Sequence, residues 1–192
     1  NSGMGSNGLT SARHDMLCTD YAENYPETFD SNVQKDLVYC GPYRLADPLP
    51  ASSLTVGEAL LSPTRSFAPV IQQVMSELGP EVSGVIHCSG GAQTKCLKFG
   101  VGVHFVKDNL FPLPPVFAAI QSASGTTWRE MYKVFNMGHR MEVYVPQDKV
   151  KAVIDVANSY NIEARQIGFT QASESNSLTL TDCHGSVHEY LD

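Results

Sequence analysis

Helical and strand-like apolar patterns alternate along this chain, and this alternation limits the folds it can adopt. Apolar residues recur at helical spacing in residues 8–25, 68–78, 116–122, 128–134 and 147–160. Strand-like runs occupy residues 84–88, 101–107, 140–145, 164–170, 177–181 and 186–190, the last two joined by a turn at His184-Gly185. Because strands interleave with helices but end in a hairpin, the sequence predicts an α+β (layered α/β) fold, a mixed β-sheet with helices packed on it. Residues 140–170 would form a right-handed crossover if their two strands are parallel neighbours.

Composition narrows the class of protein. A chain of 192 residues with 42% hydrophobic and 17% charged residues fits one globular domain, residues 1–192. The net charge of −7 argues against a nucleic-acid partner, which needs clustered basic residues. No stretch approaches the roughly 20 apolar residues of a membrane span, and no signal peptide is recognisable. Five cysteines without a CxxC pair indicate reduced thiols in a cytoplasmic protein and no zinc site.

A glycine-rich run leads into the first predicted helix. Ser6 or Asn7 is the expected N-cap, next to Gly8, with Thr10 in the first turn and Arg13 further along. A helix N-terminus offers free N–H groups and the positive end of the helix dipole, which together suit a phosphate. The run taken alone favours an ordinary glycine-rich turn with a good cap over a phosphate site.

A second polar run follows the strand expected at 84–88. His87 is followed by Cys88 and then by Ser89-Gly90-Gly91, where the missing Cβ atoms would let the backbone approach a ligand. The spacing of a Walker-type phosphate loop is absent. The alternative is a tight turn with His87 hydrogen-bonded in the core. In either case Cys88 is expected to be a small buried residue.

Two further loops carry polar residues. In residues 135–141, Asn136 and Gly138 suit a turn whose amides face a pocket, and the bulky neighbours suit core packing. His139 and Arg140 are predicted to lie on a solvated face. Residues 62–65 form either an anion clamp or a strand end with an N-cap. No catalytic residue and no metal site can be assigned from the sequence.

Four segments in order, residues 6–8 with Arg13, 61–65, 87–91 and 135–138, together resemble the C-terminal domain of the aminoimidazole ribonucleotide synthetase (phosphoribosylformylglycinamidine cyclo-ligase) family. The resemblance implies a partly ferredoxin-like mixed sheet and an ATP-dependent ligase that closes an imidazole ring in purine biosynthesis. It departs from the family pattern at Ala92, where many members have glycine, and at His139-Arg140.

The resemblance also implies a division of labour. ATP and Mg²⁺ would be held mainly by an N-terminal domain that this chain lacks, so no cofactor is expected in the fragment. Its partners would be a phosphoribosyl substrate and its own N-terminal domain, and the intact enzyme would be a homodimer. The fragment alone would bind substrate without turnover. The substrate-binding residues would be Ser6, Asn7, Gly8, Thr10, Arg13, His87, Ser89, Gly90, Gly91, Asn136 and Gly138.

Other readings remain open at this point. The same superfamily includes the amidotransferase synthetase of purine synthesis, selenophosphate synthetase, thiamine monophosphate kinase and a hydrogenase maturation factor. A non-catalytic binding module that has kept the fold is a further alternative.

Overall fold

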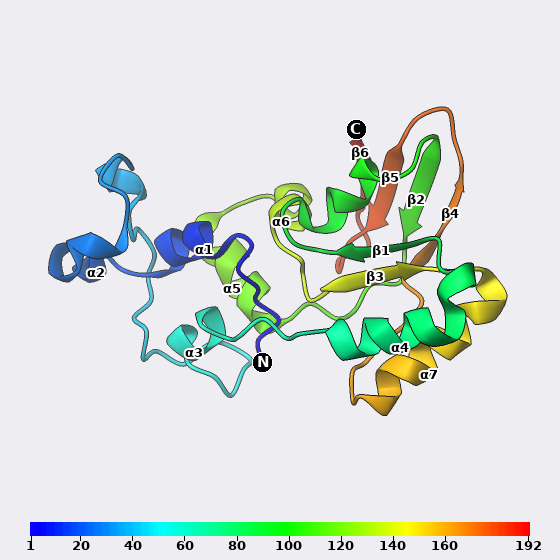
Figure 1. The fold of residues 1–192 in the computed structure, drawn as a ribbon. Helices are drawn as coiled ribbons and strands as arrows, with labels where there is room; N and C mark the ends of the chain where they lie inside the picture. Colours follow the sequence, from blue (N-terminus) through cyan, green and yellow to red (C-terminus); the bar gives the residue numbers. More distant parts are fainter. The chain divides into compact units, whose positions relative to one another are not determined.

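A computed structural model describes residues 1–192 and divides them into two compact units (Figure 1). The first unit comprises residues 1–64, 89–93 and 112–138. The second comprises residues 65–88, 94–111 and 139–192. Each unit is described by itself.

Helices make up the regular structure of the first unit. They are α1 (Leu9–Met16), α2 (Asp20–Asn24), α3 (Val56–Leu60), α5 (Pro115–Ser124) and α6 (Trp128–Val134), with 3-10 turns η1 (Pro26–Thr28) and η2 (Lys35–Leu37). Helix α1 packs beside α5, and both contact α3. Their shared core is fully buried and contains Ala12, Met16, Val56, Val116, Phe117 and Ile120.

Local sequence signals explain where these helices begin and end. Thr55 and Glu58 form a capping box at α3, each side chain bonding the other residue's backbone N–H. Thr127 caps α6 by accepting a hydrogen bond from the backbone N–H of Glu130. Helix α5 starts at Pro115 and is followed by the capping residue Gly125, whose φ of 67° is left-handed.

The predicted helix over residues 8–25 is wrong in its length. Helix α1 ends at Met16, Leu17 is extended, and a separate short helix α2 follows. The chain turns there because Leu17 pairs with Tyr43 in an isolated parallel bridge, and the Cys18 N–H donates to the Tyr43 carbonyl at 2.9 Å. Tertiary pairing therefore overrides the helical periodicity.

The second unit contains all six strands. Strands β1 (Gly84–His87) and β3 (Met141–Tyr144) form a two-stranded antiparallel sheet in which His87 pairs with Met141. A four-stranded sheet has the order β4-β2-β5-β6, from β2 (Val103–Lys107), β4 (Gly168–Ala172), β5 (Ser177–Thr181) and β6 (Val187–Leu191). Strands β2 and β5 are parallel, and the other pairs are antiparallel. The α+β class and the mixed sheet are confirmed, as is the hairpin that joins β5 to β6.

The expected crossover over residues 140–170 is not formed. Strand β3 belongs to the two-stranded sheet and β4 to the four-stranded sheet, so they are not neighbours. Between them lie η5 (Gln147–Lys149) and α7 (Val150–Ser159). The pattern identified a strand, a helix and a strand, but it carries no information on which strands pair.

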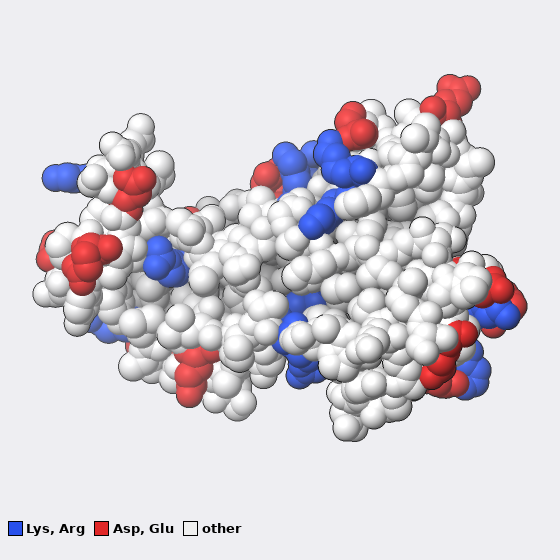
Figure 2. All heavy atoms as spheres, in the orientation of Figure 1, with Lys and Arg blue, Asp and Glu red and all other residues white.

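Two helices of the second unit pack against each other, α4 (Ala68–Leu78) and α7 (Figure 1). Val70 and Val74 of α4 form an apolar cluster with Val156 and Ala157 of α7. On the outer side of α7, Lys151 and Asp155 form an ion pair, and basic and acidic atoms lie side by side over this helix in Figure 2. Short 3-10 segments η3 (Gly79–Glu81) and η4 (Ala92–Lys98) complete the chain. No helix is long and apolar enough to cross a membrane.

Candidate functional site

The N-terminus of α1 has a different cap from the one predicted. Gly8 occupies the N-cap with φ 74°, and no side chain caps the helix, so the prediction of Ser6 or Asn7 is wrong. A Cβ atom on Gly8 would lie 2.4 Å from a ring carbon of Phe135, so only glycine fits there without displacing the ring. The Asn7 side chain is used elsewhere, because its Nδ2 donates to the carbonyl of Val134.

This helix end still has the donors that an anion would need. The Leu9 N–H reaches the Ser6 carbonyl at 3.3 Å, whereas those of Thr10 and Ser11 have no acceptor among residues 1–192. No acidic residue lies in the first turn. The helix dipole is therefore not neutralised by a carboxylate at this end.

Three separate segments of the first unit meet beside α1. The position of a Cβ on Gly90 lies 3.9 Å from Asn7 Oδ1, which brings the turn at residues 89–91 to the helix entry. A Cβ on Gly5 would lie 3.4 Å from Asn136 Nδ2, which brings in the loop that follows α6. Ten of the eleven predicted substrate-binding residues belong to this unit, and two of them, Asn7 and Gly90, are in contact range of each other.

Hydrogen bonds hold the two loops in place. Asn136 Oδ1 accepts from the Gly138 N–H at 2.8 Å, and the Asn136 carbonyl accepts from Gln93 Nε2 at 2.8 Å. Gln93 and Asn136 are 0% and 2% exposed, so these bonds are shielded from water. Gln93 was missed as a site residue. An amide side chain two residues after a glycine pair is the signal that points to it.

The glycine turn contains an unusual residue. The Ala92 N–H donates to the Ser89 carbonyl at 2.7 Å, and Ala92 has φ 44°, in the left-handed region that favours glycine. Alanine therefore adopts here the backbone conformation that a glycine would take more easily. The turn therefore forms with alanine at position 92, where many family members have glycine.

The side chains of three predicted residues are not part of this cluster. The Arg13 guanidinium donates to the Thr28 carbonyl at 3.2 Å, so it contacts the η1 segment. Thr10 is exposed on α1. His87 belongs to the second unit, where it is the exposed last residue of β1, so the alternative that buried it in the core is wrong.

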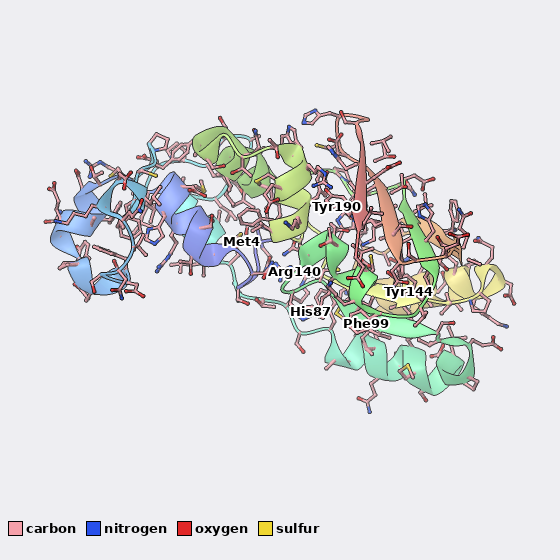
Figure 3. All side chains as sticks on the ribbon, turned by 90° about the horizontal axis from the view of Figure 1, so that it is seen from above. Met4, His87, Phe99, Arg140, Tyr144 and Tyr190 are labelled. Atoms are coloured by element: carbon pink, nitrogen blue, oxygen red, sulfur yellow. The ribbon has the colours of Figure 1, made fainter.

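His139 and Arg140 are also placed differently from the prediction. They are 3% and 8% exposed instead of lying on a solvated face. Arg140 lies near His87 at the end of the two-stranded sheet, where its carbonyl accepts from the Cys88 N–H at 2.8 Å (Figure 3). Burial, and then the neighbouring charge of Arg65, lowers the pKa of Arg140. The sequence around His139-Arg140 carries no signal that these two polar residues are buried at the start of a strand.

The first unit also contains an open cavity of about 330 Å³. Its polar lining comes from the hydroxyl residues Ser2, Ser52 and Ser53, and its apolar wall from Pro114 and Pro115. Gly138 lines it too, and is the one predicted site residue that does so. No group of three or more His, Cys, Asp or Glu side chains anywhere in residues 1–192 could hold a metal ion.

Similarity to solved structures is limited. The chain is similar to the crystal structure of HypE from E. coli with a TM-score of 0.46 and 13% identity, over 97% of this chain and 47% of that chain. This value lies below the level at which a shared fold can be argued.

Similarity in sequence is stronger. The phosphoribosylformylglycinamidine cyclo-ligase of Methanopyrus kandleri is 31% identical over 88% of this chain and 41% of its own length. The protein of that name from Methanococcus vannielii is 32% identical over 87% and 41%. This chain thus spans about two fifths of the length of these relatives. Residues 46–181 match the family model described as AIR synthase related protein, C-terminal domain. Residues 46–181 correspond to the C-terminal domain that defines this family model, and the chain therefore belongs to the family of AIR synthase related proteins.

Proposed function

We propose that this chain is the C-terminal, substrate-binding half of a phosphoribosylformylglycinamidine cyclo-ligase. The intact enzyme would use ATP to close the ring of formylglycinamidine ribonucleotide and yield aminoimidazole ribonucleotide in purine biosynthesis. Sequence identity of 31–32% to two proteins of this name, over nearly nine tenths of the chain, supports the proposal. Residues 1–192 would act as one domain in that protein.

The meeting of three segments beside α1 is the structural observation that carries the proposal. The free N–H groups of Thr10 and Ser11 would bind the 5′-phosphate of the ribonucleotide, as helix N-termini bind phosphates in general. The dipole contributes only about 0.3–1 kcal/mol per exposed charge. Arg13 would then supply the countercharge by leaving the Thr28 carbonyl, an exposed contact that costs little to break.

The two loops would line the reacting end of the substrate. Gly90 leaves open space beside Asn7, and the buried Gln93–Asn136 hydrogen bond fixes the second loop against the first. Ser89 and Gly91 flank Gly90 in the same turn and would bind with it. Such pre-positioning matters because phosphoryl transfer depends mainly on holding the two reactants in place. His87 lies in the second unit and stays a separate prediction as a substrate-binding residue.

The remaining components would come from outside this chain. ATP and Mg²⁺ would be held mainly by an N-terminal domain, and the intact cytoplasmic enzyme would be a homodimer. Ring closure needs the nucleotide and the acceptor fixed together. The 192-residue chain would therefore bind the ribonucleotide and turn it over at a negligible rate.

Thermal-shift measurements test this proposal. Formylglycinamidine ribonucleotide should raise the melting temperature of the chain, and thiamine phosphate should not, which separates the cyclo-ligase from the thiamine phosphate kinase of the same superfamily. Arg13→Ala should weaken the stabilisation, whereas Arg44→Ala, which removes a separate exposed ion pair with Asp20, should not. Absence of any shift with the ribonucleotide would favour a module that binds something else. Normal ring closure by the chain with MgATP would contradict the half-enzyme assignment.

A further inference from the structure

The side-chain amide of Asn7 has a fixed orientation. Its neighbour is the carbonyl oxygen of Val134, which can only accept a hydrogen bond, so the Asn7 atom that faces it must be the NH₂ group. The Asn7 carbonyl oxygen, Oδ1, must then point the other way, toward the glycine turn. A Cβ atom added to Gly90 would lie 3.9 Å from Oδ1, which agrees with this orientation.

The Asn7 oxygen faces the turn without a partner. No donor among residues 1–192 bonds to Oδ1, although Asn7 is only partly exposed. A partly buried carbonyl oxygen that lacks a donor is unfavourable unless water or a ligand supplies one. Gly90 is exposed and has no Cβ, so a bound molecule can reach the oxygen from that side.

We propose that Asn7 Oδ1 is the hydrogen-bond acceptor that selects an amidine ligand over the corresponding amide. This assignment rests on the proposed function, in which the ligand is a phosphoribosyl amidine. An amidine nitrogen carries N–H and is protonated at neutral pH, so it can donate to Oδ1. The amide counterpart has a carbonyl oxygen at that position, and two acceptors would face each other.

Asn7 is therefore a specificity residue, distinct from the phosphate-binding amides of Thr10 and Ser11. The phosphate is common to the amidine and the amide, and those amides bind both alike. Only the group that meets Asn7 differs. A hydrogen bond to a charged donor at a half-buried site corresponds to a preference of about 10- to 100-fold in Kd for the amidine.

Titration calorimetry on the 192-residue chain tests the assignment. The probes are formylglycinamidine ribonucleotide and the analogue in which oxygen replaces the amidine nitrogen. The wild-type chain should prefer the amidine by the stated factor. Asn7→Ala should bind the two ligands with Kd values within about twofold of each other, because the amide's affinity should change little.

Two further variants keep the test independent of folding. Gly90→Ala places a methyl group in ordinary contact with Oδ1, and Gly90 does not have a positive φ, so the fold should persist while the preference falls at least several-fold. Asn24→Ala is the matched control. Its Nδ2 also donates to a backbone carbonyl, that of Asp20 on α2, and its removal should leave the preference unchanged.

The outcomes separate the two proposals. Equal wild-type affinity for amidine and amide would overturn the role of Asn7 and leave the proposed function standing. An amidine preference that survives both Asn7→Ala and Gly90→Ala would overturn it as well. Failure of the wild-type chain to bind either ribonucleotide would overturn the proposed function and this assignment together.

Discussion

Lys107 and Glu142 form a buried ion pair that joins the two sheets of the second unit. Lys107 Nζ on β2 lies 2.5 Å from Glu142 Oε1 on β3, and both side chains are 4% exposed. The same carboxylate accepts from the Tyr144 hydroxyl at 2.5 Å and from the Cys88 thiol at 3.3 Å. Burial disfavours the charged lysine, but Glu142, together with Cys96 and Cys88, outweighs this effect and raises the pKa of Lys107. The pair thus holds β1, β2 and β3 in one arrangement.

Breaking this pair should destabilise the chain strongly. Glu142→Leu leaves a buried ammonium without its carboxylate, and we expect a loss of about 3–5 kcal/mol in unfolding free energy by denaturant titration. The double variant Lys107→Met with Glu142→Leu should recover most of that loss, since a buried apolar pair avoids the desolvation cost. A double variant no more stable than the single one would show that the pair is not the source of the effect.

The five cysteines should differ in reactivity. Burial, chiefly, raises the pKa of Cys96 to about 11 and also raises that of Cys88, whereas Cys40 and Cys183 are exposed. Because the thiolate is the reactive form, a thiol reagent at mildly alkaline pH should label Cys40 and Cys183 first. Mass spectrometry of the native chain should find Cys88 and Cys96 modified only slowly, and all five should react in denaturant. Rapid native labelling of Cys96 would contradict its burial.

The β5–β6 hairpin should lose stability in acid. Burial opposes the charge of Asp182, but His188 and the backbone N–H groups of His184 and Ser186 donate to it and lower its pKa from its usual value. Because the folded pKa is the lower one, Asp182 stabilises the fold above about pH 4, and this contribution disappears as the pH falls through the folded value. Asp182→Asn should remove that part of the acid dependence in denaturant titrations, at a cost of about 1–3 kcal/mol at neutral pH. If the variant loses unfolding free energy at low pH to the same extent as the wild-type chain, Asp182 is not the cause of that loss.

Gly8 should tolerate substitution less well than Gly125. Both have a left-handed φ, 74° and 67°, but a Cβ on Gly8 meets the Phe135 ring and one on Gly125 meets nothing within 4 Å. Gly125→Ala should therefore cost only the backbone strain, about 1 kcal/mol. Gly8→Ala adds overpacking, for a total of about 2–4 kcal/mol. Equal losses in unfolding free energy for the two variants would show that the Phe135 ring can move aside at no energetic cost.

Elements with strong periodicity were predictable from the sequence. Helices α4 and α6 have the predicted bounds, and strand β5 does too, because their apolar faces repeat without interruption between clear end signals. The split after Met16 was not predictable, since the Leu17–Tyr43 bridge joins residues far apart in sequence. The assignment of β3 and β4 to different sheets was hidden for the same reason.

In the candidate site too, some features could be predicted from the sequence and others could not. Asn7, Gly90 and Asn136 stood out by residue type, and the structure brings their segments together. The true cap at Gly8 was obscured because the reason for it, the Phe135 ring, lies on another segment of the chain. The burial of His139 and Arg140 likewise depends on packing that a polar dipeptide does not reveal.

The central claim is that the helix entry and the two loops beside it bind a phosphoribosyl ligand. Backbone amide chemical shifts of the chain, recorded during titration with formylglycinamidine ribonucleotide, test this most directly. We expect saturable shifts concentrated at Thr10, Ser11, Gly90, Gly91 and Asn136. Saturable shifts that leave these amides unmoved and cluster elsewhere would contradict it.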